Sequence, residues 1–145
     1  MKVKTAFIVG LPFCALLSMV LFAQSASSTR DGVYTADQAE QGHVLYTKQC
    51  ALCHDAAQQS AGQIPPLTGD TFLQNWNGQT VADLYGKIQT TMPSTHPGSL
   101  KPDEVAQLVA YILSLNNYPA GKTPLPTKPE SLQTIHIEMP LSGAQ

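Results

Sequence analysis

The chain has 145 residues, of which 43% are hydrophobic and 12% are charged, and its formal net charge is −2. This length accommodates one domain and not comfortably two. The 8 Lys and Arg residues are outnumbered by 10 Asp and Glu residues, which argues against nucleic-acid binding because that function uses clustered positive charge. The low content of charged residues, against a usual quarter, fits a protein that presents an uncharged face to a partner.

The first 25 residues are organised like a secretory signal peptide. Lys2 and Lys4 supply a positive start, an apolar run follows over residues 6–23, and small residues end it. A retained membrane anchor is the competing interpretation, because the run approaches the length of a bilayer span. The Gly and Pro residues within the run favour cleavage. We therefore expect export to the periplasm, with no membrane span after cleavage and without the first of the chain's 3 cysteines.

The segment that follows predicts an arm and then a helix. Residues 26–34 are small and polar without a period, so we expect a flexible arm. Thr35 and Gln38 have the spacing of a capping box at the start of a helix that runs into Cys50. Gly42 lies on its apolar face and costs about 1 kcal/mol relative to Ala. A glycine at such a place often permits the close approach of another helix.

The predicted helix leads directly into Cys50-Ala51-Leu52-Cys53-His54. Cys-x-x-Cys-His is the attachment signature of c-type haem. The two thiols add to the porphyrin vinyl groups as thioethers, and the histidine is the proximal ligand of the iron. A disulfide oxidoreductase is the alternative for a Cys-x-x-Cys pair. The histidine after the second cysteine and the helical pattern before the first favour a single covalent haem.

The second half of the chain predicts further short helices. A loop rich in Gly and Pro covers residues 56–69, and one short helical turn is predicted over residues 71–76. A helix starts at Thr80 and ends near Met92, because Pro93 disfavours helical geometry at the residue before it. The last helix begins at Pro102, a favoured first position, and ends at Asn116.

The remaining residues, 121–145, are rich in proline and show no helical period. We expect an extended tail, partly wrapped on the domain and partly mobile. Residues 135–138 alternate in polarity and could form a lone strand. The domain itself is then predicted to span residues 35–120.

The ligand on the open face of the iron decides between electron transfer and small-ligand binding. Met92 is the favoured candidate, because Pro93 holds it in an extended backbone and a thioether suits ferrous iron. The alternative is that Met92 fills a gap in the core. His96 would give a bis-histidine haem. The other candidates lie too near the haem motif or in the tail: His43, His136 and Met139.

Together these features resemble class I c-type cytochromes over about residues 34–126. The most similar members are the small cytochrome c subunits and domains that serve bacterial quinoprotein alcohol dehydrogenases. The resemblance rests on the haem motif and on five further segments: Pro65–Gly69, Phe72–Trp76, Thr90–Pro93, Leu108–Leu113 and Asn117–Gly121.

The resemblance implies an all-α fold of three to four short helices around one covalently bound haem. It implies that the first and last helices cross closely, with Gly42 near Tyr111. It also implies that a carbonyl group at Pro65 accepts a hydrogen bond from the His54 ring, which would fix its orientation. Trp76 resembles an aromatic residue that packs near the haem, although plain core filling explains it equally well.

The sequence therefore predicts a periplasmic one-electron carrier rather than an enzyme. Its single haem c would be ligated by His54 and Met92, and it would pass electrons from a dehydrogenase to a cytochrome or terminal oxidase. One alternative is a ligand-binding or peroxidase-like haem protein with a labile sixth site. Another is a cytochrome subunit fixed to a quinoprotein dehydrogenase by its tail. We expect a monomer or a dehydrogenase subunit.

Overall fold

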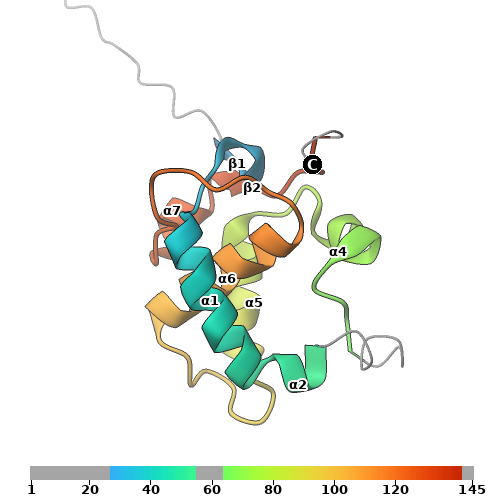
Figure 1. The fold of residues 1–145 in the computed structure, drawn as a ribbon, viewed down its shortest axis with the longest axis vertical. Helices are drawn as coiled ribbons and strands as arrows, with labels where there is room; N and C mark the ends of the chain where they lie inside the picture. Colours follow the sequence, from blue (N-terminus) through green and yellow to red (C-terminus); the bar gives the residue numbers. More distant parts are fainter. Residues whose placement is uncertain (1–26, 55–63, 142–145) are drawn as a thin grey trace, which may run out of the picture.

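The computed structural model describes residues 27–54 and 64–141. The predicted signal peptide and most of the predicted loop after the haem motif lie outside these residues. The fold is helical, which confirms the expected all-α class, with one minimal parallel strand pair in addition (Figure 1). The elements are β1 (Ser27–Ser28), a 3-10 turn (Thr29–Asp31), α1 (Ala36–Gln49), α2 (Ala51–His54), α4 (Gly69–Trp76), α5 (Val81–Thr91), α6 (Pro102–Leu115), α7 (Pro129–Leu132) and β2 (Ile135–His136).

The start of α1 differs in one detail from the predicted capping box. Thr35 Oγ1 accepts a hydrogen bond from the Gln38 backbone N–H at 3.2 Å, as expected for an N-cap. The Gln38 side chain does not return this bond. Its amide instead donates to Leu125 O at 3.0 Å and accepts from Leu125 N at 2.7 Å. Gln38 therefore joins α1 to the C-terminal segment.

The helices α1 and α6 cross closely at Gly42 (Figure 1). A Cβ atom added to Gly42 would lie 2.8 Å from Tyr111 Cβ and would overlap the carbonyl oxygen of Gln107. This is the contact that the resemblance implies. Because the two backbones touch, the C-terminal end of α1 has a fixed position relative to α6.

The helix α5 begins and ends close to the predicted residues. Thr80 and Asp83 form a complete capping box at its start. One face of the helix is buried in the core through Val81, Leu84, Tyr85 and Ile88. The helix ends at Thr91, and the backbone of the C-cap residue Met92 is extended (φ −118°, ψ 153°). Met92 thus leaves α5 at its C-terminal end, as the following proline predicts.

The helix α6 contains most of the apolar core. Its buried residues are Val105, Ala106, Leu108, Val109, Ala110, Ile112 and Leu113. At its start, Glu104 Oε2 accepts a hydrogen bond from the backbone N–H of Lys101 at 2.8 Å. Within the described residues, none of the helices is both long and apolar enough to cross a membrane.

The N-terminal arm, which was expected to be flexible, instead packs against the tail (Figure 1). The strand β1 pairs in parallel with β2, in the register Ser27 with Ile135 and Ser28 with His136. Arg30 Nε donates to Met139 O at 2.8 Å, and its guanidinium lies 3.3 Å from the Glu138 carboxylate. The tail also contains α7 and buries four apolar side chains: Leu125, Leu132, Ile135 and Ile137.

The tail also supports the turn between α4 and α5. Gly78 N donates to Ile137 O at 2.7 Å, and Ile137 N donates to Gln79 O at 2.8 Å. Residues 135–138 do form a strand region, as their alternation suggests, but it is paired on both sides rather than alone. The sequence did not predict these contacts, because each of them joins segments that lie far apart in the chain.

Candidate haem site

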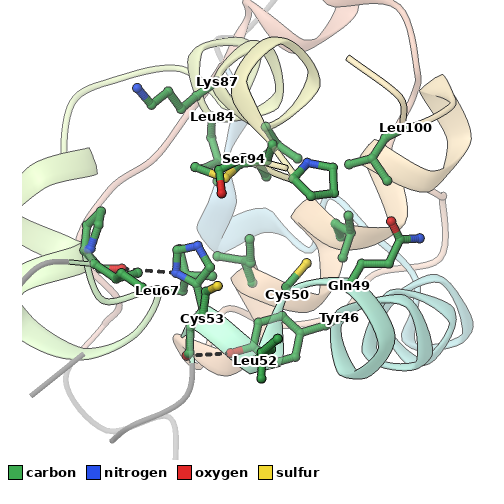
Figure 2. Close-up of a pocket in the computed structure, with 18 of the residues that line it drawn as sticks. Tyr46, Gln49, Cys50, Leu52, Cys53, Leu67, Leu84, Lys87, Ser94 and Leu100 are labelled. Atoms are coloured by element: carbon green, nitrogen blue, oxygen red, sulfur yellow. Dashed lines mark hydrogen bonds between the residues drawn. The ribbon is translucent and has the colours of Figure 1, made fainter. Parts of the chain in front are cut away.

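An apolar cavity of about 840 Å³ lies between α1, α2, α4, α5 and α6. Its volume falls within the range of about 300–1,000 Å³ that is typical of cofactor and ligand sites. Figure 2 shows Cys50 and Cys53 on one side of the cavity and Leu84 and Ser94 on the opposite side. All six predicted site residues line this one cavity: Cys50, Cys53, His54, Pro65, Trp76 and Met92.

The haem motif continues the helical path of α1 after a small break at Cys50. The backbone N–H of Cys50 donates to Tyr46 O at 2.8 Å, and that of His54 donates to Cys50 O at 2.9 Å. Cys50 and His54 are therefore one helical turn apart. Cys50 is half-buried, Cys53 is exposed, and the two thiols are not joined in a disulfide.

The environment of Cys50 does not favour disulfide exchange. Burial raises the pKa of the Cys50 thiol to about 11, and the neighbouring Cys53 adds to this shift. Reactive cysteines of disulfide oxidoreductases have lowered pKa values, because the thiolate is the nucleophile. At neutral pH Cys50 is a protonated thiol, which disfavours the disulfide oxidoreductase alternative.

His54 is oriented by a hydrogen bond to Pro65. Its Nδ1 lies 3.3 Å from the carbonyl oxygen of Pro65, which can only accept, so Nδ1–H is the donor. The lone pair then resides on Nε2, the nitrogen that suits a metal. Burial lowers the pKa of His54, and the hydrogen bond to Pro65 opposes that shift. The pKa of His54 is lowered overall, which favours the neutral imidazole, the form that ligates iron.

The structure separates the candidates for the second axial ligand. Met92 and His96 both line the cavity. Met92 is half-buried against the core, whereas His96 is exposed and its Nδ1 lies 3.2 Å from Thr95 Oγ1. Three further candidates do not line the cavity: His43, which stacks on Tyr111 with ring centroids 4.9 Å apart, His136 and Met139.

Trp76 lies at the end of α4 on the cavity wall. It is half-buried, and its ring centroid lies 6.1 Å from that of the fully buried Phe72, in a tilted arrangement. This geometry is typical of favourable aromatic pairs. Trp76 therefore both contacts the core and forms part of the cavity wall.

The sequence did not identify Asn116 as part of the site. Its side chain is only 3% exposed, and it bonds to the segment that follows Pro65. Sequence reasoning gave Asn116 only the role of ending α6. An asparagine after an apolar helical stripe is a weak signal, because its partners lie almost fifty residues away in the chain.

The donor set and the walls of the cavity fit a haem of the c type. Two thiols one turn apart can form the thioethers, a neutral imidazole can ligate iron, and a thioether or a second imidazole is available at the same cavity. The apolar lining supplied by Leu84, Ile88, Leu108 and Ile112 suits the porphyrin faces.

The segment that contains the haem motif and most of the cavity-lining residues is similar to known proteins. Residues 37–112 match the family described as cytochrome C oxidase, cbb3-type, subunit III. The chain is 33% identical over 91 residues to the cbb3-type cytochrome c oxidase subunit CcoP of Azospirillum brasilense, which covers 52% of this chain and 30% of that protein. No solved structure matches.

Two other relatives show the same domain in different settings. The chain is 32% identical over 76 residues to cytochrome c6 of Diacronema lutheri, covering 50% of this chain and 90% of that protein. It is 31% identical over 78 residues to the quinohemoprotein alcohol dehydrogenase ADH IIB of Pseudomonas putida, covering 54% of this chain and 11% of that enzyme. The chain thus spans nearly all of cytochrome c6 but only a minor part of the two larger proteins.

The family match covers just over half of the chain and includes the haem motif, the cavity-lining residues of α5 and most of α6. It therefore shows that the chain belongs to the cbb3-type cytochrome c oxidase subunit III family and is a class I c-type cytochrome, a protein of haem-based electron transfer with covalently bound haem c.

Proposed function

We propose that this cytochrome is a periplasmic one-electron carrier with a single haem c, ligated by His54 and Met92. The observation that carries the proposal is that both side chains line one apolar cavity together with Cys50 and Cys53. When bound, the haem supplies the ferrous–ferric couple. The sequence contains one Cys-x-x-Cys-His motif, which supports a count of one haem.

The protein's contribution is to hold two ligands from separate elements in fixed positions. His54 belongs to α2 and is tied to Pro65, whereas Met92 follows α5. Both α1 and α5 pack on α6. A haem iron held by both residues would change charge with little rearrangement. A methionine ligand also raises the reduction potential, since its soft thioether favours the ferrous state.

One edge of the cavity lies at the protein surface. Cys53 is exposed there, and the neighbouring Leu52 is 86% exposed. The buried side of the cavity is formed by α5 and α6. This asymmetry supports electron entry and exit at the Cys53 edge, where a redox partner can approach the porphyrin.

The names of the relatives support a place between a dehydrogenase and an oxidase. One is an oxidase subunit and another is a quinohemoprotein dehydrogenase. We propose a dehydrogenase as the donor and a cytochrome or terminal oxidase as the acceptor. The alternative in which the tail anchors a subunit is disfavoured, because the tail buries Leu132 and Ile137 against its own domain.

The axial ligand can be tested by optical spectroscopy. We expect the ferric protein to show the weak near-infrared band of sulfur-to-iron charge transfer. Met92→Ala should abolish this band, whereas the control His96→Ala should retain it. A wild-type protein that lacks the band and readily binds carbon monoxide would instead support a labile sixth site, and the electron-carrier proposal would then fail.

A further inference from the structure

Asn116 uses its whole side-chain amide inside the protein. Nδ2 donates to Leu67 O and to Ile112 O, both at 2.8 Å, and Oδ1 accepts from Gly69 N at 3.1 Å. With 3% exposure, the residue is one of the few buried polar groups in the described part of the chain. A buried amide with this many partners fixes their relative positions, because each lost bond would leave a desolvated polar group.

The bonds to Leu67 and Gly69 hold the start of α4. Thr68 occupies the N-cap position of α4, but its side chain makes no capping hydrogen bond. The Gly69 N–H, which such a helix start leaves without an intrahelical partner, is satisfied by Asn116 instead. A residue at the end of α6 therefore caps a helix that begins 47 positions earlier in the chain.

The same bonds hold the carbonyl group that orients His54. Pro65 is two residues before Leu67, and the ring of Pro66 restricts the backbone between them. The Pro65 carbonyl accepts the His54 Nδ1–H at 3.3 Å. Anchoring Leu67 O against α6 therefore restricts where Pro65 O can lie.

The helix α6, which ends at the C-cap residue Asn116, has a fixed position in the fold. The end of α6 is held by its buried apolar face, and α6 touches α1 at Gly42. Since α1 leads into the haem motif, α6 holds His54 along two routes. One route runs through α1 and Cys50, and the other runs through Asn116 and Pro65.

We propose that Asn116 is a positioning residue for the haem ligand His54, acting through Leu67 and the Pro65 carbonyl. It sets the orientation of the imidazole and the strength of the Nδ1–H bond, and with it the basicity of the ligand. The inference rests on the proposed ligation by His54 and does not depend on Met92. It assigns Asn116 a function that a mere helix terminator would not have.

The test uses the reduced holoprotein, Asn116→Asp and the adjacent control Asn117→Gly. Asp keeps an oxygen for Gly69 N but places a second oxygen against the carbonyls of Leu67 and Ile112. Asn117 is exposed and has φ 62°, so glycine can replace it without backbone strain. Leu132→Ala serves as a second control that lowers stability away from the cavity.

The readouts are proton NMR of the His54 ring N–H and the reduction potential. In Asn116→Asp we expect solvent exchange of the His54 Nδ1–H and the Gly69 amide to accelerate at least tenfold. The potential is measured in Asn116→Ser, which adds no charge, and it should rise because a weaker hydrogen bond makes the imidazole a poorer donor to ferric iron. Neither control should change His54 exchange relative to the core amides of α6.

Two outcomes would overturn the inference. In the first, Gly69 exchange accelerates while the His54 ring N–H and the potential stay as in the wild type. In the second, His54 exchange rises no more than in Leu132→Ala, which marks a general loss of stability. If Asn116→Asp does not fold, the milder Asn116→Ser is judged by the same criteria. Failure of the underlying ligation by His54 is separately visible, because the wild type would then lack a haem-shifted His54 ring, and failure at Met92 is reported by the near-infrared band.

Discussion

Gly42 lies where α1 meets α6, and a side chain cannot fit between the two helices. A Cβ there would overlap the backbone carbonyl of Gln107. Glycine is intrinsically unfavourable in a helix by about 1 kcal/mol. The crossing of α1 and α6 therefore requires a residue that α1 alone would not favour, because the contact depends on the absence of a side chain.

Gly42→Ala should therefore destabilise the protein despite its better helix propensity. We expect a loss of about 1–3 kcal/mol in the free energy of unfolding, which is typical of overpacked cores, measured by denaturant titration with circular dichroism. The matched control is Gly86→Ala in α5, where an added Cβ meets nothing within 4 Å. That variant should be neutral or more stable by up to about 1 kcal/mol. Equal effects of the two substitutions would contradict the close crossing.

The cap of α5 should give a pH-dependent contribution to stability. The Asp83 carboxylate accepts from Thr80 Oγ1 at 2.7 Å and from Thr80 N at 2.8 Å. The hydrogen bond from the Thr80 hydroxyl, followed by that from its backbone, lowers the pKa of Asp83. A carboxyl group with a lowered pKa in the folded state stabilises that state above its unfolded pKa. This contribution disappears as the pH falls through the folded pKa.

Asp83→Asn should therefore lower stability at neutral pH and have little effect in acid. The expected loss is a few tenths to about 1 kcal/mol, as for other exposed helix caps. Urea unfolding of wild type and variant from about pH 7 down to about pH 2, a range that extends well below the usual carboxyl pKa, measures the difference. A loss of the same size at both ends of this range would show that the carboxylate charge is not the cause.

The arm and the tail pack together at the end of the fold that contains β1, β2 and α7 (Figure 1). Leu132 in α7 is fully buried and packs in the same core as α5. Leu132→Ala should cost about 2–5 kcal/mol in unfolding free energy, the usual range for a buried leucine. The control Leu141→Ala, at a side chain that is 65% exposed, should change stability by less than about 0.5 kcal/mol. A loss below about 1 kcal/mol at Leu132 would mean that the tail is not part of the core.

The elements also show which features a sequence can predict. The helices α1, α5 and α6 were predicted to within one or two residues, because caps, prolines and apolar periodicity are local signals. The pairing of the arm with the tail was not predicted, since β1 and β2 pair across more than a hundred residues. The candidate site likewise has features with local sequence signals and features that depend on long-range contacts. The haem motif and Met92 are recognisable from spacing alone, whereas the contacts of Asn116 exist only after folding.

At the scale of the whole molecule, the cavity interrupts an already small core. The helices α4, α5 and α6 turn apolar side chains toward this cavity as well as toward each other. A chain of this size buries a limited part of its surface. The haem therefore supplies a large part of the apolar centre, and folding should depend on its attachment.

Loss of haem attachment should consequently unfold most of the protein. We expect Cys50→Ala/Cys53→Ala to lose most of its helicity, as measured by far-ultraviolet circular dichroism. Met92→Ala is the matched control, because it should retain the covalent haem and most of the helicity. Native helicity in the double cysteine variant would show that α1, α5, α6 and the tail form a sufficient core by themselves.

In the proposed carrier, His54 and Met92 would both ligate the iron of one haem. Proton NMR of the reduced protein tests it most directly, because a methionine methyl group above a porphyrin is shifted far upfield by the ring current. We predict one such methyl signal, present in the wild type and in Met139→Leu and absent in Met92→Leu. A wild-type spectrum without this signal, or one in which the signal survives Met92→Leu, would contradict the account.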